Sequence, residues 1–269
     1  MFDNICKFLA ETFSADFATW LLGESIELTQ LSPSELSLEP IRADALILLQ
    51  SDEVVLHLEF QTQPKADIPF RMIDYRLRVY RRFPQKQMRQ TVIYLQSTES
   101  DLVQQSAFTL EQTRHEFEVI RLWEQPTSAF LQSPGLLPFA VLSQADGSFA
   151  VAAGNRTQTL RQVAQIIDQI PDSRAQSNVL ASTFVLAGLV LESEVIQQVL
   201  RRDIMQESVT YQLIKSEGRE EGREEARQET LRQIVANLIR EGMSADVIAR
   251  ITGLTIEQVQ QFQALIAES

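Results

Sequence analysis

The chain has 269 residues, of which 44% are hydrophobic and 22% charged, so it is long enough to bury a core and too apolar to remain disordered. Its net charge of −12 opposes broad binding of a polyanion, so any nucleic-acid contact must be local. The single cysteine, Cys6, excludes an intramolecular disulfide. With no signal peptide or membrane-spanning segment in the sequence, these features predict a cytoplasmic protein without a membrane partner.

The chain begins with a predicted amphipathic helix over residues 3–22, because its apolar residues recur at steps of three and four. Glu11 lies on this helix, either as a solvated side chain or as an additional carboxylate for a metal site. A first strand is predicted over residues 25–31, before a Ser-Pro-Ser turn.

Two further strands, residues 41–50 and 53–63, are predicted to form a hairpin around a Ser51-Asp52 turn. In the second strand, a period of two separates apolar from polar residues. The apolar set is Val54, Leu56, Leu58 and Phe60, and the polar set is His57, Glu59 and Gln61. One face of this strand is therefore expected to pack in a core, and the other to hold chemistry.

The pairing of these strands decides whether a metal site forms. If Gln50 pairs with Glu53, Asp44 lies directly across from Glu59, with Cβ atoms roughly 5 Å apart. Two carboxylates that close repel each other unless a cation lies between them, so this register predicts a divalent-metal site. Ser-Asp is not a favoured hairpin turn, which leaves a longer loop and another register open. A shift of one residue would place Asp44 on the wrong face.

A basic helix is predicted over residues 68–83, running to about Arg82 and stopped by Pro84. The segment 71–89 carries seven basic residues against Asp74 alone, a local charge of +6: Arg71, Arg76, Arg78, Arg81, Arg82, Lys86 and Arg89. This contrast with the acidic chain indicates a phosphate-facing surface. The alternative is that these side chains pair with surface carboxylates.

Strands are predicted over residues 91–96 and 116–123. The order helix, three strands, helix and two strands predicts an α/β fold with a mixed sheet flanked by helices. A short apolar run covers 139–143, and helices are predicted over 160–170 and 177–200, whose apolar spacing indicates packing rather than chemistry.

The C-terminal region differs in composition. Residues 217–228 repeat Glu-Gly-Arg-Glu with little apolar content, which is typical of a solvated helical linker or a weak coiled coil. After it, Gly242 is predicted to close one short helix, Ser244 to cap the next, and Thr255 to cap the last after a turn at Gly253. This pattern resembles a helix-turn-helix, but its second helix has no Lys or Arg, so self-association or simple packing is favoured over DNA reading.

We therefore divide the chain into four parts. Residues 1–125 form the predicted α/β core, 126–215 a mainly helical extension without an assigned role, 216–230 a charged helical linker, and 231–269 a small helical tail.

The combination of Asp44, Glu59-x-Gln61 ending an apolar strand, and an Arg-rich helix resembles the PD-(D/E)XK nuclease superfamily. More narrowly, it is similar to the recombination-promoting nuclease or putative transposase (Rpn-type) family, whose members also begin with a Phe-rich helix and often end in Glu-Gly-Arg-Glu repeats. The resemblance implies a restriction-endonuclease-like sheet with Mg²⁺, or Mn²⁺, held by Asp44 and Glu59. It also implies that Gln61 positions the attacking water.

Two departures from the superfamily pattern matter. Ala43 stands where the superfamily usually has proline, and Gln61 stands where it has lysine. Glutamine orients water by hydrogen bonding but supplies no positive charge to the transition state. Lys65 or Arg71 is the candidate replacement for that charge. His57 is either a base or a packed strand residue.

These observations give two functional hypotheses. The first is a Mg²⁺-dependent DNA endonuclease linked to recombination or mobile elements, with Arg71 and Arg78 contacting the DNA backbone. The second is a catalytically inactive module that keeps the nuclease fold and forms a homo-oligomer through its C-terminal helices. A ribonuclease H-like transposase is a weaker third reading, because no late stretch stands out for the additional carboxylate it needs.

Overall fold

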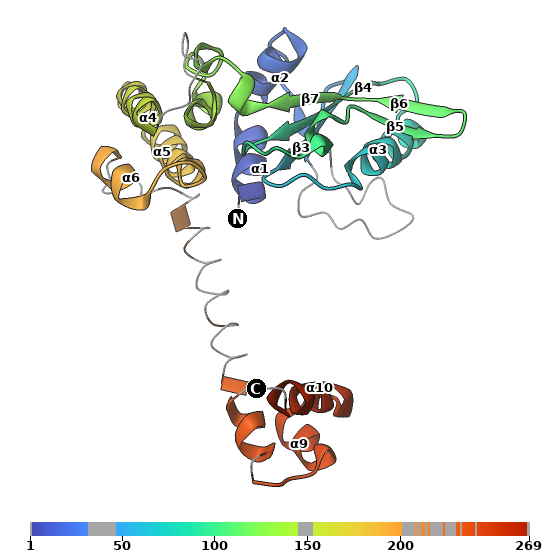
Figure 1. Ribbon diagram of the computed structural model, residues 1–269. Coiled ribbons are helices and arrows are strands. Elements are labelled where there is room, and N and C mark those ends of the chain that lie inside the picture. Colours follow the sequence, from blue (N-terminus) through green and yellow to red (C-terminus); the bar gives the residue numbers. More distant parts are fainter. Residues whose placement is uncertain are drawn as a thin grey trace. The chain divides into compact units, whose positions relative to one another are not determined.

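The computed structural model describes residues 2–31, 47–144 and 153–200, then residues 208, 211–212, 215, 223, 230–231, 233–239 and 241–267. The chain divides into two compact units, 1–212 and 213–269, which are described separately. The predicted α/β class is confirmed. The first unit contains a mixed five-stranded sheet flanked by helices, and helices also form the C-terminal end of the chain (Figure 1).

The main sheet has the order β1-β2-β3-β4-β7. Its strands are β1 (Thr29–Gln30), β2 (Ile47–Gln50), β3 (Val54–Gln61), β4 (Gln87–Tyr94) and β7 (Glu118–Arg121). The first three pair antiparallel, while β3, β4 and β7 pair parallel. β3 is therefore the central strand, with its backbone paired on both edges. Helix α3 (Ile68–Arg82) forms the crossover from β3 to β4, and it ends where Pro84 predicts.

The hairpin register differs from the prediction by two residues. Gln50 pairs with Val55, and Ile47 pairs with Leu58. The loop is longer than Ser51-Asp52, because the Ser51 amide donates to the Val54 carbonyl and the Ser51 hydroxyl accepts from the Val54 amide. The prediction that Asp44 lies opposite Glu59 depends on pairing Gln50 with Glu53, and the structure pairs Gln50 with Val55 instead. Asp44 itself lies outside the described residues.

Both faces of β3 are covered, so the strand is buried from Val55 to Gln61. On one face, Phe60 stacks on Phe139 at a ring separation of 5.8 Å and meets Phe17 edge-on at 6.4 Å. These rings come from α2 (Ser14–Leu22) and the 3₁₀ segment η5 (Pro134–Leu142). On the other face, Val55 clusters with Tyr75 and Val79 of α3. The polar face of β3 is thus dry, not solvated.

Several predicted elements are divided or displaced. The predicted helix 3–22 is two helices, α1 (Phe2–Thr12) and α2, separated at Phe13. The predicted helix 177–200 is also two, α5 (Ser173–Ala187) and α6 (Ser193–Val199). α4 (Ala153–Ile167) precedes them, and the run predicted at 139–143 belongs to η5. In Figure 1, α4, α5 and α6 lie beyond α1, away from α3.

A small second sheet, β5 (Ala107–Leu110) and β6 (Thr113–Glu116), was not predicted. Its turn contains Glu111 with φ of 52°, in a region that usually selects Gly or Asn, so the sequence carries no glycine signal for this hairpin. Short 3₁₀ turns complete this part of the chain: η2 (Asp101–Gln104), η3 (Leu122–Glu124) and η4 (Thr127–Ala129).

In the second unit, α9 (Ala245–Thr252) and α10 (Ile256–Ala267) are joined through Gly253, whose φ is 74°. Thr255 and Gln258 form the predicted cap reciprocally: the Gln258 amide donates to the Thr255 hydroxyl, and the Thr255 amide donates to the Gln258 side chain. The Gly242 turn is also confirmed, with φ of 75°. The charged linker predicted at 216–230 lies almost wholly outside the described residues.

Where the chain is described, no helix is both long and apolar enough to cross a bilayer.

Candidate functional site

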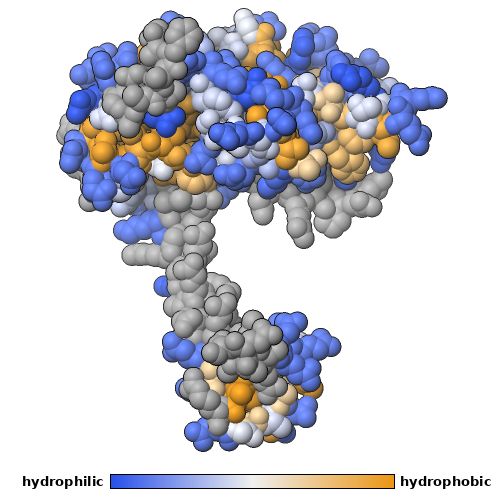
Figure 2. All heavy atoms as spheres, viewed as in Figure 1, coloured by the Kyte–Doolittle hydropathy of each residue, from blue (hydrophilic) through white to orange (hydrophobic). Residues whose placement is uncertain are grey.

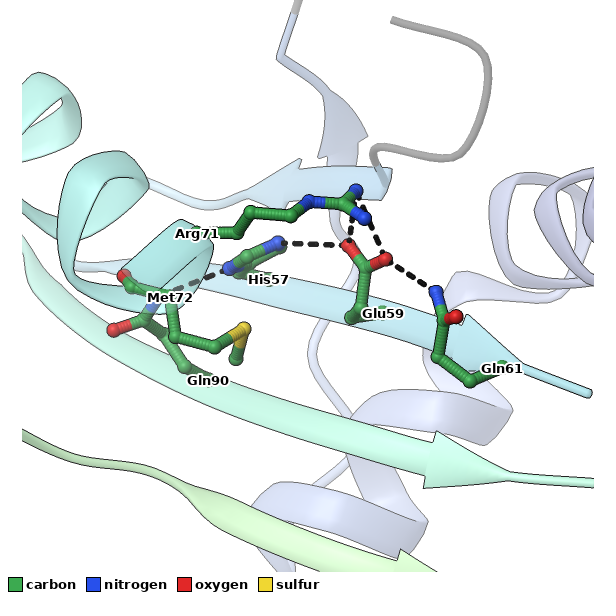
Figure 3. A network of polar contacts seen from close by, with 6 residues as sticks. All are labelled: His57, Glu59, Gln61, Arg71, Met72 and Gln90. Atoms are coloured by element: carbon green, nitrogen blue, oxygen red, sulfur yellow. Dashed lines mark hydrogen bonds and ion pairs between the residues drawn. The ribbon is translucent and has the colours of Figure 1, made fainter. Parts of the chain in front are cut away.

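Glu59 is the centre of a polar network beneath α3 (Figure 3). Its side chain is fully buried on β3. Arg71 Nη2 lies 3.0 Å from Oε1 and 3.2 Å from Oε2, and Gln61 Nε2 donates to Oε1 at 2.7 Å. The β-strand period brings Glu59 and Gln61 to one side, and α3 supplies Arg71 from its first turns. The carboxylate therefore faces donors from two elements.

The protonation of Glu59 is finely balanced. Burial raises the pKa of Glu59 to about 7, while the Arg71 charge and the Gln61 hydrogen bond act in the opposite direction. A carboxyl group with this pKa exchanges its proton near neutral pH. Any added cation at Glu59 favours the ionised form, so cation binding and proton release are linked.

His57 lies beside Glu59 on the same face of β3, and its tautomer follows from its partners. Gln90 Nε2 donates to the Met72 carbonyl at 2.7 Å and contacts His57 Nδ1 at 3.0 Å. His115 Nε2 lies 2.8 Å from Gln90 Oε1 and completes the orientation of that amide. Since the Gln90 nitrogen is a donor, His57 Nδ1 accepts and the neutral ring carries its proton on Nε2.

The proton on His57 Nε2 points toward the carboxylate. His57 Nε2 lies 3.9 Å from Glu59 Oε2, which is too long for a hydrogen bond, and this buried atom has no hydrogen-bond partner in the described structure. Burial, with the nearby charge of Arg71, lowers the pKa of His57 to about 3. His57 is therefore a neutral donor at neutral pH, and it offers an unused N–H next to Glu59.

The structure brings together some of the predicted site residues. Glu59, Gln61 and Arg71 meet, but Arg71 pairs with Glu59 instead of standing free for a phosphate. Arg78 pairs with Asp74 on α3 at 2.9 Å, an intrahelical contact four residues apart. Glu11 accepts a hydrogen bond from Gln30 at 2.8 Å. Because Arg71 and Arg78 are both paired, α3 has less free positive charge than its sequence suggests.

The described residues do not complete a magnesium site by themselves. They contain no group of three or more His, Cys, Asp or Glu side chains that could hold a metal ion. Mg²⁺ requires oxygen ligands, whereas His57 offers an N–H and the Glu59 oxygens face a guanidinium. Of the two predicted ligands, Glu59 fits, and a metal site there depends on Asp44.

Gln90 and His115 are network residues that sequence reasoning missed. The strand containing Gln90 was predicted to start at Thr91, but β4 begins at Gln87. Its parallel register places Gln90 next to His57. That pairing is the signal that identifies Gln90, and it becomes visible only once β3 and β4 are known to be neighbours.

No protein-family model, curated protein or solved structure matches this chain.

Proposed function

We propose that this protein is a Mg²⁺-dependent DNA endonuclease that hydrolyses phosphodiester bonds with water and also accepts Mn²⁺. The observation that carries the proposal is Glu59, a fully buried carboxylate on the central strand that accepts a hydrogen bond from Gln61 and pairs with Arg71. A buried ion pair stabilises a fold poorly compared with apolar packing, so a carboxylate with a pKa near 7 in such a place favours a functional role.

In this proposal, Asp44 and Glu59 hold the metal, as the PD-(D/E)XK resemblance implies. When bound, the metal lowers the pKa of a water molecule and offsets negative charge on the phosphate. Gln61 orients that water through its amide. His57, through its free N–H, donates a hydrogen bond to an oxygen bound beside Glu59.

Arg71 is proposed to replace the lysine that the superfamily has at the position of Gln61. Arg71 now pairs with Glu59, and a cation held by that carboxylate would weaken the pair, because both charges are attracted to the same ionised group. Arg71 would then be free to contact the phosphate, where its fork geometry suits two oxygens. Arg78 is proposed to contact the DNA backbone further along α3. The links to recombination and to a cytoplasmic location rest on the resemblance and on composition.

A plasmid-cleavage assay tests this function. Wild type, Asp44→Asn and Glu59→Gln are incubated with supercoiled plasmid in Mg²⁺, Mn²⁺, Ca²⁺ or chelator. We expect nicking and linearisation by wild type in Mg²⁺ and Mn²⁺, and loss of both in the two variants. Folded wild type that cleaves neither single- nor double-stranded DNA, or equal cleavage by all three proteins, would contradict the proposal.

The second candidate is a catalytically inactive assembly module. It is favoured by the pairing of Arg71 with Glu59 and by the glutamine in place of lysine. This candidate predicts a homo-oligomer that forms through the C-terminal helices without metal. Light scattering on the full chain and on a truncation before Glu217 tests it: loss of the oligomer on truncation supports assembly, and a monomer in both cases rejects it.

A further inference from the structure

The outer side of α3 exposes aromatic and aliphatic side chains. Phe70 and Tyr80 are each 59% exposed, and Leu77, at 55%, lies between them. Their spacing of seven and three residues places all three on one side of the helix, away from buried Met72 and Val79. Large apolar side chains grouped in this way on a surface indicate a binding site.

Strand β5 extends this surface. The Phe108 ring lies 5.9 Å from the Phe70 ring, and Leu110 is 59% exposed. In Figure 2, a pale-orange area lies where Figure 1 places α3 and the β5–β6 hairpin, and blue hydrophilic surface borders it. We name Phe70, Leu77, Tyr80 and Phe108 the α3 surface, and Leu110, at the end of β5, is not part of it.

The charge beside the α3 surface is positive. Arg81 and Arg82 are exposed and form no ion pair with any other described residue, unlike Arg71 and Arg78. By helix geometry, Arg81 shares the side of α3 that carries Phe70 and Leu77. In a chain of net charge −12, cations interleaved with exposed rings select a polyanion that also has flat apolar groups.

We propose that the α3 surface binds single-stranded nucleic acid, with unpaired bases stacked on Phe70 and Tyr80 and the backbone held by Arg81 and its neighbours. This inference rests on the proposed nuclease function and deepens it by naming unpaired strands as the substrate class. In a duplex the faces of the bases are already stacked on one another, whereas an unpaired base presents its face to an aromatic ring.

The geometry connects this surface to the candidate site. The ten residue steps from Phe70 to Tyr80 rise about 15 Å along α3, which matches roughly four nucleotide steps along a strand. Phe70 is adjacent to Arg71, and Arg71 contacts Glu59. A strand that lies on the rings therefore passes the turn of α3 that supplies Arg71.

Fluorescence anisotropy with the full chain in chelator tests the proposal without cleavage. The probes are labelled oligothymidine of about 20 nucleotides and a duplex of equal length, both at low salt. The variants are Phe70→Ala, Tyr80→Ala and Arg81→Gln. Tyr80→Phe keeps the ring, and Leu110→Ala removes an equally exposed side chain that has no ring. Circular dichroism verifies the fold of each variant.

We expect wild type to bind the single strand more tightly than the duplex, and Tyr80→Ala and Phe70→Ala each to weaken binding roughly tenfold to a hundredfold. Tyr80→Phe and Leu110→Ala remain within about twofold of wild type. Arg81→Gln weakens binding and lowers its dependence on salt by about one counterion.

Three results would overturn the inference: no binding by wild type, equal binding of the two probes, or equal losses in Tyr80→Ala and Leu110→Ala. If Tyr80→Ala and Leu110→Ala lose equal affinity for the single strand, and light scattering also shows a change of oligomeric state, the surface would be assigned to a protein partner. Because binding is measured in chelator, single-strand binding without any nuclease activity would support the surface while rejecting the proposed reaction.

Discussion

The two faces of β3 are equally buried but are built from opposite chemistry. On one face, Phe60 packs among the rings of Phe17 and Phe139. On the other, Glu59 meets Arg71 and a neutral His57. Apolar packing stabilises the sheet, whereas a buried carboxylate near its pKa contributes little stability. The apolar face holds the fold, whereas we propose that the polar face is kept for chemistry, and substitutions on the two faces should differ accordingly.

The largest effect is expected on the apolar face. Phe60→Ala removes a fully buried ring and leaves a cavity, which costs about 3–5 kcal/mol of the free energy of unfolding. Leu77→Ala, at an exposed position, should change that free energy by less than about 0.5 kcal/mol. Denaturant unfolding followed by circular dichroism measures both. A loss for Phe60→Ala as small as that for Leu77→Ala would show that this face does not hold the fold.

Breaking the ion pair on the polar face should have the next largest effect. Arg71→Gln leaves the Glu59 carboxylate buried without its cation and is expected to lower the free energy of unfolding by about 3 kcal/mol at about pH 8. The loss should shrink at about pH 5.5, where the carboxyl group of the variant is protonated. In the background of Glu59→Gln, Arg71→Gln should have little effect. A loss that is independent of pH and of Glu59 would mean that Arg71 acts through packing alone.

Removing the charge of Glu59 should stabilise the fold as the pH rises. The pKa of Glu59 is raised to about 7, so the folded state retains a proton that the unfolded state releases at lower pH, and wild type loses stability as the pH rises toward 7. Relative to wild type, Glu59→Gln should gain about 2 kcal/mol between about pH 5.5 and pH 8. Unfolding curves at both pH values measure this gain, and a constant difference would contradict the raised pKa.

Replacing His57 should change the pH dependence of stability less than replacing Glu59 does, and in the opposite direction. Its pKa is lowered to about 3, so the unfolded state gains a proton below about pH 6.5 while the folded state does not, and wild type loses stability as the pH falls. His57→Gln removes this loss and should improve by about 1 kcal/mol relative to wild type on going from about pH 8 to pH 5.5. A parallel pH dependence in variant and wild type would show that His57 is protonated in the folded state.

The sequence predicts best where local rules decide the structure. Pro84 sets the end of α3, and Gly253 with Thr255 defines the turn between α9 and α10. Prediction from the sequence fails where the chain carries no local signal. Phe13 separates α1 from α2 without a glycine or proline, and the β5–β6 turn uses Glu111 at positive φ.

In the candidate site, too, local contacts are predictable from the sequence and tertiary contacts are not. The two-residue period of β3 brings Glu59 and Gln61 together, as predicted, because that period is local. The contact of Arg71 with Glu59 depends on how α3 docks over the sheet, and Gln90 reaches His57 through strand pairing. The alternation along β3 predicts one face for the core and one for chemistry, but it does not reveal that the polar face is also dry. Tertiary packing decides that, and it is what raises the pKa of Glu59.

We propose that Glu59 is kept buried in order to bind a divalent cation. Titration calorimetry of Mn²⁺ into wild type, Asp44→Asn and Glu59→Gln, near pH 7 in two buffers of different ionisation enthalpy, tests it most directly. We expect wild type to bind Mn²⁺ with release of part of a proton, because a cation at Glu59 would displace both the proton and Arg71. We expect both variants to lose this binding. Equal binding by wild type and Glu59→Gln, or no binding by folded wild type, would contradict it.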